Sequence, residues 1–152
     1  MAYLLDTGIL LRLVNAQDAQ HGMIQLAVRA LIAQQESLHI ATQNVAEFWN
    51  VATRPVANNG FGWSPPVALN ALTLEIEPIC SVLVESSSNL AELKRLVSTY
   101  AVIGRQVHDA RLVATMLVWQ VPSILTLNDA DFRRYAAEGI NVVTPLSLTS
   151  LP

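Results

Sequence analysis

Five short apolar runs alternate with longer stretches of helical periodicity, and this alternation restricts the possible fold more than any other feature of the sequence. The expected strands are residues 2–5, 38–41, 81–84, 123–125 and 141–143. The expected helices are residues 9–14, 18–35, 42–54, a segment opening at Pro65, 88–100, 108–119 and 129–137. Thr42 is a plausible N-cap of the third of these helices. Strands separated by helices favour a parallel sheet that is covered on both faces. We therefore predict an α/β fold, a three-layer α/β/α sandwich with a mostly parallel sheet of about five strands, as one domain over residues 1–152.

Acidic residues follow the expected strands or open the helices after them. Asp6 ends the first strand, and Asp129 and Asp131 follow the fourth. Glu47 lies about a turn and a half into the helix after the second strand, and Asp109 opens a helix that is apolar nearly all round. Ligands of open parallel sheets bind beyond the carboxyl ends of the strands. We therefore expect acids from four distant parts of the chain to converge at this edge.

Each of these acids also has a purely structural interpretation. Asp6 is a possible N-cap of the first helix, and Asp109 can complement the dipole of its helix. Asn128 or Asp129 is a possible N-cap of the helix that follows the fourth strand. Glu47 could belong to a solvated polar helix face, which it shares with Gln43, Asn44, Asn50 and Arg54. Taken singly, the acids leave both interpretations open.

The joint pattern favours a cation site. The chain has only 12 acidic residues, and at least four of them fall at the ligand edge of the expected sheet. Crowded carboxylates repel one another and take up protons unless a cation is present. Oxygen ligands without histidine or cysteine spacing suit Mg²⁺ or Mn²⁺, ions that activate water and stabilise charge on a phosphate. We therefore predict a magnesium or manganese cofactor.

Composition bears on the partners. Charged residues make up 14% of the chain and hydrophobic residues 52%, so we expect a sizeable apolar patch to be covered in a homodimer or by another protein. The net charge of −3 provides no general basic field for a polyanion. Cys80 is the only cysteine, which excludes a disulfide framework and a cysteine-based zinc site.

The ends and the apolar runs indicate the compartment. The N-terminal segment has no basic region and meets an acid at position 6, so it does not resemble a signal peptide. The apolar run 112–128 is broken by Gln120 and Pro122 and does not predict a membrane span. We expect a cytoplasmic protein with no membrane partner.

Four segments together resemble the PIN-domain nucleases, and among them the VapC-type toxins of toxin–antitoxin pairs. The segments are YLLDTGILLRLV at 3–14, TQNVAEFWNVATRP at 42–55, VHDARLVATMLV at 107–118 and SILTLNDADFRRY at 123–135. Each is weak alone, but their order and spacing match the family over almost the whole chain. The resemblance implies a magnesium- or manganese-dependent ribonuclease that cuts single-stranded or loop RNA.

The resemblance also implies roles for individual residues. Asp6, Glu47 and Asp109 match the family's three acids. Asp131, in the pair Asp131-Phe132, is our choice for the fourth acid, and Asp129 is the reserve. The side chains expected to support the acids are Thr7, Asn44, Thr126 and Asn128.

An antitoxin is the partner that the resemblance implies. It would lie on apolar surface and send a basic side chain into the acidic pocket. The segment PVANNGFGW at 55–63 has the look of an exposed loop, so Phe61 and Trp63 are the expected docking residues. Arg133 and Arg134 are equally compatible with contacting RNA and with a solvated helix face.

Two other functions remain open from the sequence. The first is a PIN-like module that binds protein or RNA without cutting it, for which crowded carboxylates are unnecessary. The second is a phosphatase with Asp6 as nucleophile, but Gly8 stands where haloacid-type enzymes have a second aspartate.

Overall fold

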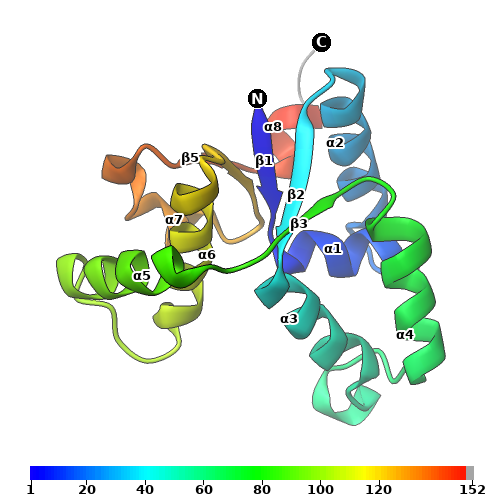
Figure 1. Cartoon of the computed structure of the whole chain (residues 1–152). Helices are drawn as coiled ribbons and strands as arrows, with labels where there is room; N and C mark the ends of the chain where they lie inside the picture. Colours follow the sequence, from blue (N-terminus) through cyan, green and yellow to red (C-terminus); the bar gives the residue numbers. More distant parts are fainter. Residues whose placement is uncertain (150–152) are drawn as a thin grey trace.

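The structure, a computed structural model, describes residues 1–149 and contains one sheet of five parallel strands (Figure 1). The strand order is β3-β2-β1-β4-β5. The strands are β1 Ala2–Leu5, β2 Ser37–Ala41, β3 Ser81–Leu83, β4 Ser123–Leu125 and β5 Asn141–Val143. All five predicted strands are present, and the prediction of an α/β sandwich is confirmed.

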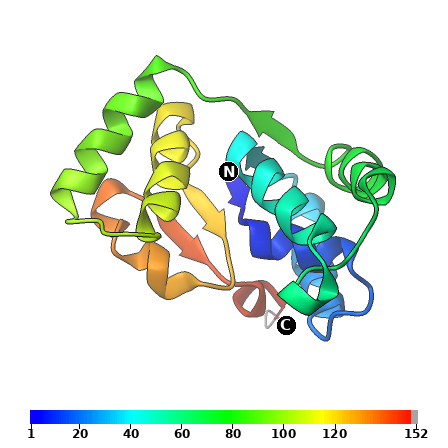
Figure 2. The same cartoon turned by 90° about the horizontal axis from the view of Figure 1, so that it is seen from below.

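Helices cover both faces of the sheet (Figures 1 and 2). Successive side chains of a strand point to opposite faces, so Tyr3 and Leu5 enter one apolar core and Leu4 enters the other. The helices packed on the first face are α1 Thr7–Val14, α2 His21–Ala33, α3 Thr42–Thr53, α4 Pro65–Ala71 with its π-helical continuation Leu72–Ile76, and α8 Pro145–Thr149. Those on the second face are α5 Ser87–Thr99, α6 Gln106–Trp119 and α7 Asp129–Arg133.

The strand register brings the ends of β1 and β4 together. Leu5 is paired with Leu125, and the Asp6 N–H donates to the Leu125 carbonyl at 3.0 Å. Asp6 and Thr126, the residues that follow these strands, therefore leave the sheet side by side. This is the edge at which the sequence predicts the acids to gather.

Three details differ from the prediction. The helix expected over 129–137 ends at Arg133, and a separate 3₁₀ turn, Ala136–Glu138, follows before Gly139 at φ 82°. Thr42 is not the N-cap of α3; Ala41 is, and its N–H donates to Asn44 Oδ1 at 2.8 Å. The C-terminal helix α8 was not predicted, because Pro145–Thr149 is too short for a helical period to be visible.

The segment after α3 is a tight turn rather than an open loop. A 3₁₀ turn, Val56–Asn58, is followed by Gly60, where an added Cβ would lie 1.9 Å from the Arg54 carbonyl oxygen. Phe61 and Trp63 are partly buried against the first core, with ring centroids 5.0 Å apart. Phe61 and Trp63 are therefore less exposed than expected, because the backbone of the turn folds these rings inward, and docking at this segment stays a prediction.

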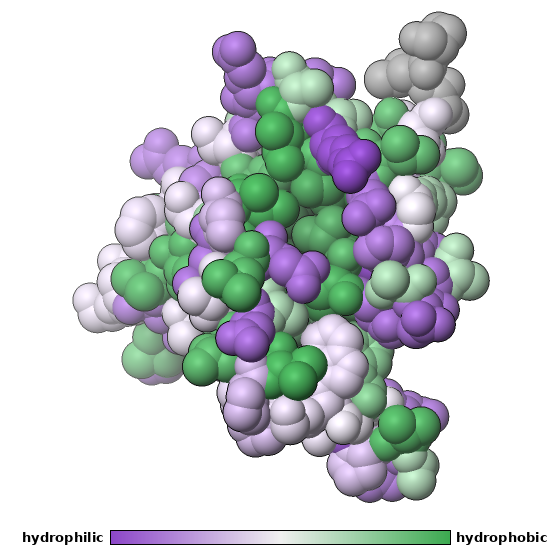
Figure 3. All heavy atoms as spheres, turned by 90° about the vertical axis from the view of Figure 1, so that its right-hand side faces the viewer, coloured by the Kyte–Doolittle hydropathy of each residue, from purple (hydrophilic) through white to green (hydrophobic). Residues whose placement is uncertain are grey.

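Apolar side chains are exposed elsewhere, on several elements at once. Figure 3 shows hydrophobic residues gathered in a hollowed part of the face that α2 and α4 border. Large apolar residues exposed on these elements and on the π-helical continuation are Leu26, Ile32, Val67, Leu69 and Leu74. Within residues 1–149, no helix has both the length and the apolar character required to cross a membrane.

Candidate active site

A cleft of about 890 Å³ opens at the carboxyl edge of the sheet. Its lining comes from the β1–α1 junction, α3, the beginning of α6 and the beginning of α7. Asp6, Glu47, Asp109 and Asp131 all line it. Four acids that are distant in the sequence therefore share one cavity, as the positions of the strands predicted.

Asp6 is held in place by two hydrogen bonds. The Thr7 N–H donates to Oδ1 at 2.8 Å, and the Thr126 hydroxyl donates to Oδ2 at 2.6 Å. Asp6 is also the N-cap of α1, so the capping interpretation and the cleft interpretation both describe it. Burial raises its pKa, as do the charges of Glu47 and Asp131, whereas the two hydrogen bonds lower it.

Glu47 is tied to Asp6 through Thr7. The Thr7 hydroxyl donates to Glu47 Oε2 at 2.7 Å and accepts from Asn44 Nδ2 at 3.0 Å. Asn44 is completely buried, and its other amide atom accepts the Ala41 N–H that precedes α3. Asn44 is thus part of the site and not of a solvated helix face, which corrects the structural interpretation of this surface.

Gln43 fixes the other oxygen of Glu47. Its Nε2 donates to Glu47 Oε1 at 2.6 Å and to the backbone carbonyl of His108 at 2.9 Å. Both partners are acceptors only, so they determine which end of the amide faces them. Gln43 is 4% exposed and its Oε1 is buried with no partner in residues 1–149. Sequence reasoning missed this role, because the sequence shows only that Gln43 and Glu47 share a helix face.

Asp109 has a strongly raised pKa. Its pKa is raised to about 6, first by burial and then by the charges of Asp131, Asp6 and Glu47, with a small opposing effect of His108. The carboxylates are therefore close enough to influence one another's ionisation. This is the behaviour expected of a crowded acidic site without a cation.

The fourth acid differs from its reserve in both position and partner. Asp131 lines the cleft and raises the pKa values of Asp6 and Asp109. Asp129 is ion-paired with Arg133 one turn later on α7. The geometry therefore favours Asp131 over Asp129 as the fourth acid. Asn128 also lines the cleft, although its side chain makes no capping bond to α7.

Ion pairing differs between the four acids of the cleft and most of the other acids. Among residues 1–149, none of them forms an ion pair, although six other acids do. Those six are Asp18, Glu36, Glu85, Glu92, Asp129 and Glu138. The unneutralised set of oxygen donors has the chemistry that Mg²⁺ and Mn²⁺ bind.

The side chains are not gathered into a complete metal shell. Within the described residues, no three acidic, histidine or cysteine side chains form a group that could hold an ion as they lie. Magnesium ordinarily uses one or two carboxylates and keeps several waters, so a complete protein shell is not required. The donors therefore fit such an ion, with water and substrate oxygens supplying the remaining ligands.

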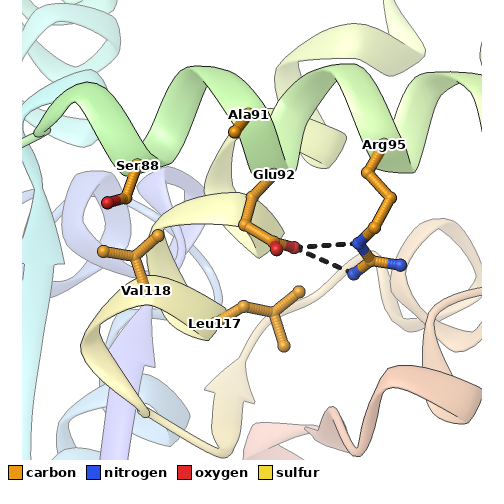
Figure 4. A pocket seen from close by; sticks show the side chains of 6 residues that line it. All are labelled: Ser88, Ala91, Glu92, Arg95, Leu117 and Val118. Carbon is orange, nitrogen blue, oxygen red and sulfur yellow. Dashed lines mark hydrogen bonds and ion pairs between the residues drawn. The ribbon is translucent and has the colours of Figure 1, made fainter.

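A second cavity, of about 470 Å³, lies between α5 and α6 (Figure 4). Its one acid among the lining residues, Glu92, is bound by Arg95 at 2.9 Å. Arg95 also binds Glu138 at 2.6 Å. The charges of this pocket are satisfied within the protein, and it holds no comparable group of free carboxylates.

The chain belongs to the PIN-domain family, whose sequence model matches residues 3–138. The match spans all four segments that carried the resemblance, and the predicted family is confirmed. No curated protein sequence matches the chain significantly.

Solved structures with the same fold come from toxin–antitoxin systems. VapBC-1 from nontypeable Haemophilus influenzae superposes with a TM-score of 0.70 at 18% identity, covering 96% of this chain and 99% of that chain. FitAcB from Neisseria gonorrhoeae gives 0.68 at 18% identity, with 95% and 98% covered. VapC20 from Mycobacterium tuberculosis, described as a sarcin-ricin loop cleaving toxin, gives 0.59 at 17% identity, with 80% and 86% covered. At these identities the similarity establishes the shared fold.

Proposed function

We propose that the protein is a cytoplasmic, metal-dependent endoribonuclease that hydrolyses phosphodiester bonds of single-stranded or loop RNA. The observation that carries the proposal is the group of four carboxylates without ion pairs in one cleft, Asp6, Glu47, Asp109 and Asp131. Membership of the PIN family and the likeness to a toxin that cleaves the sarcin-ricin loop support it. A binding module would have no need for charges that raise one another's pKa.

The residues divide into ligands and supports. Asp6, Asp109 and Asp131, with Glu47, would hold Mg²⁺ or Mn²⁺, which when bound activates water and stabilises the charge that develops on the phosphate. Thr126 and Thr7 fix the oxygens of Asp6, and Thr7 also fixes Glu47. These supports limit the rotation of two carboxylates before any substrate arrives.

The cellular partner that we propose is an antitoxin. The neighbours named VapBC and FitAcB are toxin–antitoxin proteins of the same fold. The exposed apolar residues on α2 and α4 offer a surface for a helical or extended antitoxin segment, in place of Phe61 and Trp63. A homodimer would cover further apolar surface, for which the low charge content of the chain is the reason.

The test is RNA hydrolysis by the purified protein with and without metal. Labelled single-stranded RNA should be cut in Mg²⁺ or Mn²⁺ and left intact in excess EDTA, with activity restored when the ion is returned in excess. DNA of the same sequence and a fully paired RNA serve as comparison substrates. Complete cleavage in EDTA would contradict the metal mechanism, and no cleavage in either ion would contradict the nuclease proposal.

A further inference from the structure

Two arginines of the cleft have no carboxylate partner. Five basic residues form no ion pair within residues 1–149, namely Arg29, Arg54, Lys94, Arg105 and Arg134. Of these five, Arg54 and Arg105 line the acidic cleft. These two arginines lie near unpaired carboxylates but form no ion pair with them, so their positive charges remain available to a ligand.

The other arginines near the cleft are already engaged. Arg111 donates to both oxygens of Glu85, at 2.6 and 3.1 Å. Arg133 is paired with Asp129, and Arg134 donates to Gln106 and to the Tyr100 carbonyl. Neither Arg133 nor Arg134 lines the cleft, so the two residues that the sequence left as possible RNA contacts are not placed to contact a strand within it.

Arg54 is positioned by the turn that follows it. Its Nη2 donates to the Asn59 carbonyl at 3.1 Å, and Gly60 packs directly on its backbone. Its Nε is buried and has no hydrogen-bond partner among the described residues. Nη1 makes no hydrogen bond to residues 1–149, so the turn holds the guanidinium while leaving one amino group free.

Arg105 comes from a different wall. It occupies the N-cap position of α6, immediately before the turn that carries Asp109, and it is exposed. In Figures 1 and 2 the end of α3 and the α5–α6 turn lie on the two sides of the carboxyl edge of β1. The acids thus lie in a cleft with an unpaired arginine on each wall.

We infer that Arg54 and Arg105 bind the phosphates on either side of the bond that is cut, and so hold a single RNA strand across the acids. This inference rests on the proposed function and adds the residues that bind its substrate. A protein with a net charge of −3 has no general attraction for RNA, and four carboxylates repel the scissile phosphate. Guanidinium groups on both walls would offset this repulsion and match phosphate oxygens in pairs.

The salt dependence of binding tests the inference. An Asp109→Asn background keeps a labelled 12-nucleotide RNA intact, and its affinity is measured by anisotropy in Mg²⁺ at several salt concentrations. Each phosphate contact on a single strand contributes about 0.7 to the slope of log K against log salt. Arg54→Gln and Arg105→Gln should each reduce the slope by about 0.7 and weaken binding about fivefold at 0.1 M salt.

Two further variants separate charge from structure. Arg29→Gln removes an equivalent exposed charge from α2, outside the cleft, and should leave the slope unchanged. Arg54→Lys keeps the charge and should retain the slope, even where loss of the Asn59 bond lowers the melting temperature. An unchanged slope in the double glutamine variant, or an equal loss with Arg29→Gln, would overturn the inference.

The outcome also distinguishes this inference from the proposed function. If the parent protein cuts RNA but the double variant keeps its slope and KM, only the arginine assignment fails. If the parent neither binds nor cuts RNA, both fail. Polyglutamate serves as a probe for an acidic protein partner. If the double glutamine variant binds polyglutamate more weakly than the parent does, but binds RNA equally well, the arginines belong to a site for such a partner and the inference is overturned.

Discussion

The pKa of Asp109 in the acidic cleft and that of Glu138, beside the α5–α6 pocket, are shifted in opposite directions. Arg95 lines the α5–α6 pocket and binds Glu92 within it and Glu138 beside it, and its hydrogen bonds hold the pKa of Glu138 below its usual value. In the cleft, burial and then the charges of neighbouring acids raise the pKa of Asp109 to about 6. The same kind of side chain is neutralised within the protein in one pocket and left uncompensated in the other.

Acids that are paired within the protein have a structural role, whereas unpaired acids in a cleft indicate a functional one. An exposed ion pair contributes about 0–1 kcal/mol and needs nothing outside the chain. Four unpaired acids cost stability, and only a bound cation or partner offsets that cost. The contrast therefore predicts large functional effects and stabilising substitutions in the cleft, but small, destabilising effects in the α5–α6 pocket.

The largest expected effect is on hydrolysis. Asp6→Asn or Asp109→Asn should lower the rate of RNA cleavage in Mg²⁺ by at least about 1,000-fold, because each removes an anionic ligand while keeping its volume. Glu138→Gln, the matched change at the ion pair beside the α5–α6 pocket, should stay within about twofold of the parent. Initial rates with labelled RNA provide the measurement, and equal losses in both pockets would contradict the contrast.

A smaller effect is expected at Gln43. Replacing it with leucine frees Glu47 Oε1 and removes the bond to the His108 carbonyl, so it should weaken metal binding and activity about 10- to 100-fold. Titration calorimetry with Mn²⁺ measures the affinity independently of turnover. Gln106→Leu is the control, since Gln106 lines the same cleft but bonds to Arg134. Unchanged metal affinity in Gln43→Leu would exclude a positioning role.

The fold could be predicted from the sequence because apolar periodicity is a local signal. Each of the five strands is a short apolar run, and α6 is apolar on nearly every side. Local signals are weaker at helix ends. Thr42 was the expected N-cap of α3, but the N-cap is Ala41, whose N–H donates to Asn44 Oδ1. The partial burial of Phe61 and Trp63 was not predicted, because the turn-forming residues around them gave no indication that the backbone folds back onto α3.

The acids of the site could be predicted, but their supports only in part. Strand ends place Asp6 and Asp131 at one edge, and that inference requires only the sheet topology. The bond from Gln43 to the His108 carbonyl joins residues 65 positions apart, and the bond from Thr126 to Asp6 spans 120. Such contacts depend on tertiary packing, so they cannot be predicted from the local periodicity of the sequence.

Asp109→Asn should also change stability in metal-free buffer. A raised folded-state pKa makes ionisation unfavourable to folding, so the penalty appears as pH rises above the unfolded value and is complete above about 6. At pH 7.5 the variant should gain on the order of 1–2 kcal/mol after allowance for screening of a half-exposed group. At pH 4 it should gain little. Chemical denaturation at both pH values measures the difference, and a loss of stability at pH 7.5 would show that Asp109 acts as a structural first-turn acid.

The smallest expected effect has the opposite sign. Glu138 has a lowered folded-state pKa, so its ion pair with Arg95 contributes stability above the unfolded value, and this contribution is lost as pH falls through the folded one. Glu138→Gln should therefore destabilise by less than about 1 kcal/mol at pH 7.5, with the difference shrinking in acid or high salt. Because Asp109 lies in the other pocket, the double variant should show the sum of the two single effects. A stabilised Glu138→Gln protein at pH 7.5 would show that the Arg95 cluster, too, carries uncompensated charge, and the contrast between this cluster and the cleft would no longer hold.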